Sequence, residues 1–260
     1  MQRERRYREE FLFQLVKGGI SGTELEAWAI RIGVEFDCPR TVVILDLINE
    51  SLRPDLALME LQHCQAQLAG KRPNLLTALI SHRELVIFEA FDLGGTRMTK
   101  SEYAHKRLLA LDSVLRDTLG TPAVMSMGVA LTGIEGVTLS CQSALKTLRV
   151  GRLRNMHETL FSFYDLSLPV LLAGLGSGWQ AEQFRQPLQR LGAQDKRGVL
   201  LRRTLGVWFA QNGRPVATAK ALRIHRNTLD YRLRIIGELT GLDLESTEDG
   251  LLLYIALQLE

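Results

Sequence analysis

The sequence predicts an α+β domain followed by an all-helical domain. Two observations carry this prediction. β-branched and alternating apolar segments, which are typical of strands, occur only between residues 36 and 168. Apolar residues at helical spacing occupy nearly all of residues 169–260. With 46% hydrophobic and 23% charged residues among 260, the chain has the composition of a globular protein that builds its own cores.

Residues 1–35 are expected to form two helices that precede the α/β domain. The first begins in the charged N-terminal segment, has an apolar face and ends at Gly18 and Gly19. The second runs from Ser21 to Ile32, because apolar residues recur there every three or four positions.

Residues 36–168 are predicted to alternate in the order β-α-β-β-α-β-α-β. The clearest strand is the β-branched run from Thr41 to Ile48, and a tight turn at Ser81-His82-Arg83 joins two later strands. This order predicts a single sheet with helices packed on it, a ferredoxin-like layout. The expected strands are 41–48, 74–80, 84–88, 123–131 and 159–164, and the expected helices are 56–68, 102–119 and 137–150.

Residues 169–260 are predicted to form the second domain, with helices only. A cluster of glycines between residues 165 and 195 marks the boundary. The expected helices are 169–175, 180–191, 196–211, 216–222, 226–239 and 248–259.

Positive charge is concentrated in one short block of this second domain. Between Asp195 and Ile236 the chain has ten basic and two acidic residues, a surplus of eight, whereas the whole chain has a net charge of +3. The remainder is therefore net acidic. A solvated helical surface could carry such a block, but so could a surface that binds a polyanion.

The spacing inside this block fits a helix-turn-helix. Pro215 suits the first turn of the first helix, and small residues are expected to keep that helix slim so that its partner can approach. These small residues are Ala217, Ala219 and Ala221. Leu222 and Ile224 plug the turn, and the recognition helix runs from about Arg226 to Ile236. Its inward stripe is Leu229, Leu233 and Ile236.

The outward flank of the recognition helix carries side chains that can contact DNA. Arginine can bond guanine and asparagine can bond adenine through two hydrogen bonds each, while lysine, arginine and helix-terminal amides suit phosphates. The predicted DNA-binding residues are Lys220, Arg223, His225, Arg226, Asn227, Thr228, Asp230, Tyr231, Arg232 and Arg234. The alternative from spacing alone is a plain helical hairpin with a basic exterior.

Particular segments resemble a known family. The segment Ala219–Leu233, with its core IHRNTLxYRL, and the segments Gly237–Leu244 and Leu251–Leu259 resemble the C-terminal domain of sugar-diacid (carbohydrate diacid) transcription regulators. These regulators are part of the wider PucR-like helix-turn-helix family. Residues 126–130 and 142–146 resemble that family's degenerate GGDEF-like domain, and the resemblance extends over essentially the whole chain.

The resemblance implies a DNA-binding regulator of glucarate, galactarate or glycerate metabolism genes. Its partners would be double-stranded DNA, further copies of itself in a homodimer or higher homo-oligomer, and RNA polymerase. We expect three regions: N-terminal helices (1–35), a GGDEF-like domain (36–168) and a PucR-type helix-turn-helix domain (169–260). Regulators of this kind carry an N-terminal diacid-sensing domain, and we expect this chain to lack it because it starts at what resembles the helix leaving that domain.

Two other function classes stay open. A GGDEF-like fold raises the possibility of nucleotide binding or residual cyclase chemistry, which needs convergent carboxylates around metal. The corresponding turn, Ile80 to Leu85, has Glu84 as its only acid, and Gly94-Gly95 is followed by Thr96-Arg97 rather than by acids. We therefore expect no enzyme activity, catalytic residue or cofactor. The other class is an interaction module in which the basic helix meets an acidic protein.

The remaining residue types favour a cytoplasmic protein without metal. The three cysteines are widely spaced and form no CxxC pair, as in reduced intracellular proteins. No histidine lies three or four residues from another histidine or a cysteine, so no metal site is expected. The apolar runs are too short to span a bilayer.

Overall fold

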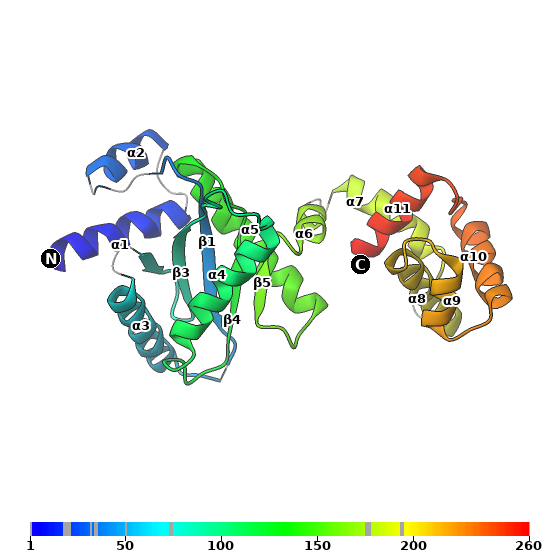
Figure 1. The fold of residues 1–260 in the computed structure, drawn as a ribbon, viewed down its shortest axis with the longest axis horizontal. Helices are drawn as coiled ribbons and strands as arrows, with labels where there is room; N and C mark the ends of the chain where they lie inside the picture. The colour runs from blue at the N-terminus through cyan, green and yellow to red at the C-terminus, as the bar shows by residue number, and fades with distance from the viewer. Residues whose placement is uncertain are drawn as a thin grey trace. The chain divides into compact units, whose positions relative to one another are not determined.

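The computed structural model describes residues 2–17, 22–31, 33, 36–49, 51–72, 75–174, 178–192 and 195–259. The chain divides into two compact units, Met1–Val170 and Leu171–Glu260 (Figure 1). The first is an α/β unit and the second is helical. No helix among the described residues is long and apolar enough to cross a membrane.

The α/β unit is built on one five-stranded sheet with the order β2-β3-β1-β4-β5. β1 is antiparallel to both β3 and β4, β2 is antiparallel to β3, and β5 pairs in parallel with β4. The predicted order β-α-β-β-α-β-α-β is confirmed. The strands are β1 (Arg40–Leu47), β2 (Leu76–Leu79), β3 (Glu84–Ala90), β4 (Ala123–Met127) and β5 (Leu160–Ser162).

Helices cover both faces of this sheet (Figure 1). Alternate residues of β1 point to opposite faces. Val43 and Leu45 therefore join the core under α3 (Pro54–Lys71) and α4 (Lys100–Leu115). Val42 and Ile44 join the core on the other face. That core is covered by α1 (Gln2–Lys17), α2 (Gly22–Arg31) and α5 (Gly133–Arg154).

Local chemistry explains where two elements differ from the predicted bounds. α4 begins at Lys100, before the expected start, because Thr99 and Glu102 form a reciprocal capping box. β4 ends at Met127, although a strand to residue 131 was expected. Gly128 lies so close to α5 that an added Cβ would meet the Ser140 carbonyl oxygen at 2.1 Å. The chain can therefore approach the helix there only through a glycine.

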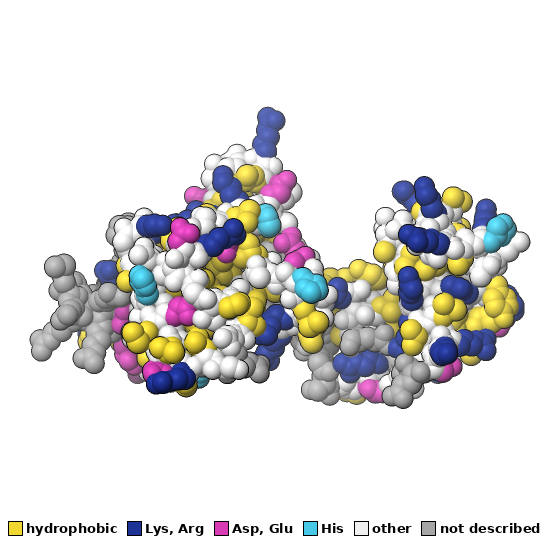
Figure 2. Space-filling view, turned by 90° about the horizontal axis from the view of Figure 1, so that it is seen from below, with side chains coloured by type: hydrophobic (Ala, Val, Ile, Leu, Met, Phe, Trp, Pro, Cys, Tyr) yellow, Lys and Arg dark blue, Asp and Glu magenta, His cyan; other side chains and the backbone are white. Residues whose placement is uncertain are grey.

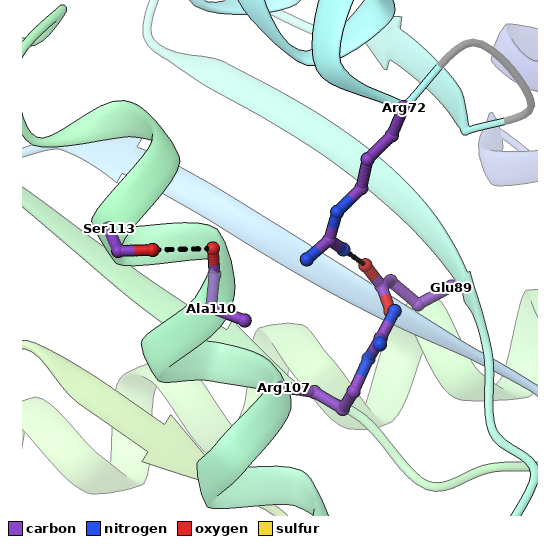
Figure 3. A network of polar contacts seen from close by, with 5 residues as sticks. All are labelled: Arg72, Glu89, Arg107, Ala110 and Ser113. Carbon is purple, nitrogen blue, oxygen red and sulfur yellow. Dashed lines mark hydrogen bonds and ion pairs between the residues drawn. The ribbon is translucent and has the colours of Figure 1, made fainter.

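A buried carboxylate joins β3 to both helices on one face of the sheet. Glu89 is fully buried, and Figure 3 shows Arg72, at the end of α3, and Arg107, on α4, converging on its two oxygens. The Arg72 Nη1 to Glu89 Oε1 distance is 2.5 Å, and Arg107 contacts Oε2 through both Nε, at 2.7 Å, and Nη2. The pairing offsets the cost of burying the charge.

The helical unit forms around a core of its own. Leu188, Leu201, Leu205, Ile236 and Leu253 are among its buried residues. α6 (Ser167–Ala173) lies across the division between the two units. The other helices are α7 (Trp179–Gln189), α8 (Lys196–Ala210), α9 (Pro215–Leu222), α10 (Arg226–Thr240) and α11 (Thr247–Gln258).

Candidate nucleic-acid interface

α9 and α10 are joined by a short turn that the sequence specifies closely. α9 begins at Pro215, which has no backbone N–H and so leaves no unsatisfied donor at the first helical position. At its end the Ile224 N–H donates to the Ala219 carbonyl (3.0 Å) and the Arg223 N–H donates to the Lys220 carbonyl (3.1 Å). This pair of bonds is a Schellman motif, and it requires a left-handed residue, here Arg223 with φ 56°.

Because arginine is strained in the left-handed region, Arg223→Gly should stabilise the helical unit by about 0.5–1 kcal/mol. Urea unfolding of the full chain measures this change. Lys220→Gly is the matched control, because it also removes one cation but at a residue with ordinary helical backbone angles. It should lower the free energy of unfolding by about 1 kcal/mol. A loss of stability in Arg223→Gly as large as in Lys220→Gly would contradict the account of the turn.

α10 is anchored from beneath by its apolar stripe, as predicted. Leu229 and Ile236 are fully buried and Leu233 is partly buried. His225 is the N-cap, and its Nδ1 accepts a hydrogen bond from the Asn227 N–H (3.2 Å). The helix continues past Ile236 to Thr240 and ends at Gly241, whose φ of 75° is left-handed. The stripe fixes which flank of α10 faces solvent.

The prediction that three alanines keep α9 slim is only partly right. Ala219 is buried and Ala217 is half-buried, but Ala221 is exposed and does not face a partner helix. The prediction was wrong there because Ala217, Ala219 and Ala221 alternate, whereas one helical face repeats every three or four residues. Thr218, which the sequence did not single out, is fully buried and donates its hydroxyl to the Arg214 carbonyl (2.8 Å).

Nine of the ten predicted DNA-binding residues are exposed, and the tenth is Arg232. Arg232 is half-buried, and its Nη1 lies 3.3 Å from Thr204 Oγ1 on α8. It therefore ties α10 to α8, a role that the sequence did not indicate. Figure 2 shows many Lys and Arg side chains on one face of the helical unit. The exposed nine are Lys220, Arg223, His225, Arg226, Asn227, Thr228, Asp230, Tyr231 and Arg234.

The charged residues on the exposed flank of α10 are held to different extents. Arg234 is fixed on two sides, by Glu238 at 2.5 Å and by the Tyr231 ring, whose centroid lies 5.4 Å from Cζ. Arg226 is held more loosely, because its Nε lies 3.8 Å from Asp230 Oδ2. Among the described residues, Lys220 and Arg223 have no carboxylate within ion-pair distance. This surface offers cations and an amide to an anionic ligand.

The pairing of β1 with β3 brings together two acids, of which the sequence analysis named only Glu84. The β1–β3 register places Asp46 opposite Glu84. Burial, and then the negative charge of Glu84, raises the pKa of Asp46, while Arg152 and Arg83 oppose that rise. Arg152 Nη1 lies 3.3 Å from Asp46, and Arg83 donates through both Nε and Nη2 to the Leu47 carbonyl. Arg152 therefore pairs with one of the two acids, while Arg83 is held by a backbone carbonyl.

A ferredoxin-like unit followed by a helix-turn-helix defines a two-domain transcription regulator. The PucR C-terminal helix-turn-helix domain family matches residues 201–259, and the GGDEF-like domain family matches residues 17–150. The chain is 39% identical over its full length to the carbohydrate diacid regulator of Escherichia coli K12, spanning 67% of that protein. It belongs to the family of carbohydrate diacid regulators.

Two further relatives are similar to this chain. An uncharacterized protein of Haemophilus influenzae is 31% identical over 98% of the chain and 66% of its own length. The transcriptional activator PmfR of Paenarthrobacter nicotinovorans is 43% identical over 28% of the chain and 16% of its own length. The chain thus spans about two thirds of the length of the E. coli and H. influenzae proteins.

Proposed function

We propose that the exposed flank of α10 binds in the major groove of DNA at control regions of sugar-diacid metabolism genes. One observation carries this proposal: α10 is anchored by buried Leu229 and Ile236, so that its polar flank is free to meet a duplex. An α-helix fits the major groove, where every base pair presents a distinct pattern of donors and acceptors. The name of the E. coli relative supports the choice of pathway.

The position of each exposed residue indicates whether it would contact bases or phosphates. Arg226 and Asn227 lie in the first turn of α10, where recognition helices contact base edges. Lys220, at the end of α9, and Arg223, in the turn, would contact phosphates. Phosphate contacts set the position of the helix, and base contacts select the sequence.

An electrophoretic shift assay against genomic fragments, repeated at rising salt, tests DNA binding. We expect a subset of fragments to be bound. Their affinity should fall steeply as the salt concentration rises, because the cationic side chains of the protein release counterions condensed on the DNA. Binding of every fragment with equal affinity would contradict sequence-specific regulation. Fragments enriched by repeated selection would give the operator, and neighbouring diacid-metabolism genes would support the pathway.

Lys220→Ala should weaken binding to every duplex by a similar factor. It removes one phosphate contact, so the slope of log K against log salt should become shallower by about one unit. Titrations of the selected and a random duplex at several salt concentrations measure both effects. Lys196→Ala gives a charge-matched control, because Lys196 is also exposed and its replacement removes the same charge from α8, outside the helix-turn-helix. A loss confined to the selected duplex would instead make Lys220 a base reader.

We also propose that the protein acts in the cytoplasm as a homodimer that contacts RNA polymerase. Two copies of α10 related by a two-fold axis would read half-sites about one helical turn, or a multiple of it, apart. Sedimentation of the protein with and without the selected duplex tests the dimer. A single protein chain on each bound duplex would contradict it.

A further inference from the structure

We infer that Asp230 selects a cytosine amino group in the major groove, at a different base pair from the one that Arg226 reads. This inference rests on the proposed function and specifies the chemistry that the site recognises. Asp230 is an acid in the middle of the exposed flank, among Arg226, Tyr231 and Arg234. A carboxylate there faces the negative charge of any duplex, so it weakens binding wherever it gains no donor.

The structure leaves the Asp230 carboxylate available for such a contact. Its side chain is 54% exposed, and its ion-pair partner Arg226 is 63% exposed at a separation of 3.8 Å. A pair this open and long contributes little to the fold. Both groups can therefore turn toward a ligand at small cost. Glu238, in contrast, is engaged by Arg234 at 2.5 Å.

The spacing of the two residues places their side chains at different base pairs. Asp230 follows Arg226 by four residues, which is one turn and about 6 Å along the helix axis. Stacked bases in duplex DNA are about 3.4 Å apart, so the two side chains reach different steps of the groove. Arginine matches the two acceptors of guanine, and a carboxylate matches the amino donor of cytosine. An acid also rejects guanine and thymine, whose hydrogen-bonding groups in the major groove are only acceptors, and it suits adenine less well because the adenine amino group lies beside the N7 acceptor.

The test compares Asp230→Asn with Glu248→Gln, which neutralises an exposed acid on α11, outside the helix-turn-helix. Each full-length variant is titrated with the duplex selected by the wild-type protein, with its single base-pair variants and with a random duplex. We expect Asp230→Asn to bind the random duplex more tightly than the wild type does. We expect it to lose roughly five- to 150-fold of the preference for C·G at one base pair. Glu248→Gln should leave that preference unchanged.

The position of the lost preference decides the role of Asp230. Loss at a different base pair from the one affected by Arg226→Ala supports direct recognition. Loss at the same base pair overturns it, because Asp230 would then only orient Arg226. An equal change on all duplexes overturns it as well. If the wild-type protein itself shows no preferred duplex, the proposed function fails, whereas a failure confined to Asp230→Asn removes only this inference.

Discussion

Glu89→Gln is expected to lower the free energy of unfolding of the α/β unit by about 3–5 kcal/mol. Glu89 is fully buried, and it is the shared partner of Arg72 and Arg107. An amide of nearly the same shape carries no charge, so two partly buried guanidinium groups would face each other without compensation. Urea unfolding of the full chain, followed by circular dichroism, measures the loss.

Two further variants separate this effect from a general sensitivity to lost charge. Asp55→Asn breaks the exposed pair with Arg53, at 2.6 Å, and should cost less than about 1 kcal/mol. Replacing Glu89, Arg72 and Arg107 together by methionine or leucine should recover much of the lost stability, because no buried charge remains. If Glu89→Gln costs no more than Asp55→Asn, the buried network does not hold β3 to α3 and α4.

Arg226→Ala and Asn227→Ala are each expected to weaken binding to the selected duplex by about 1–3 kcal/mol. Each removes a two-bond contact to a base edge, and both side chains are exposed at the start of α10. The affinity for a random duplex should fall much less, because random DNA is held through phosphates. Fluorescence anisotropy with both duplexes at one salt concentration measures the ratio of the affinities for the selected and the random duplex.

Arg203→Ala is the matched control for Arg226→Ala, because Arg203 is also exposed but belongs to α8. It removes the same charge and should affect both duplexes equally. Equal losses on the selected and random duplexes for Arg226→Ala would show that Arg226 contacts phosphates rather than bases.

The sequence predicted those features that depend on neighbours along the chain. Hydrophobic periodicity was enough to order the strands and helices, and to place Leu229 and Ile236 beneath α10. The left-handed conformation of Arg223 was not predicted, because glycine or asparagine normally marks such a position. The buried face of α9 was assigned incorrectly, because the faces of a short, alanine-rich helix differ little in hydrophobicity.

Features that depend on distant residues could not be predicted from the sequence. The expected strand 84–88 stopped before Glu89 because a charged residue normally ends a buried strand; only the folded chain brings Arg72 and Arg107 to it. Asp46 and Glu84 meet through strand register alone. The bond from Arg232 to Thr204 likewise depends on how α10 packs on α8.

The most direct test of the central claim is methylation protection of guanine N7, an atom that lies in the major groove. The selected duplex is treated with dimethyl sulfate, free and saturated with either wild-type protein or Arg226→Ala. We expect the wild-type protein to protect a small set of guanines, and Arg226→Ala to lose protection at one of them while the others stay protected. A saturated wild-type complex with no protected guanine would contradict the placement of α10 in the groove, and undiminished protection in Arg226→Ala would contradict the role of Arg226 as a base reader.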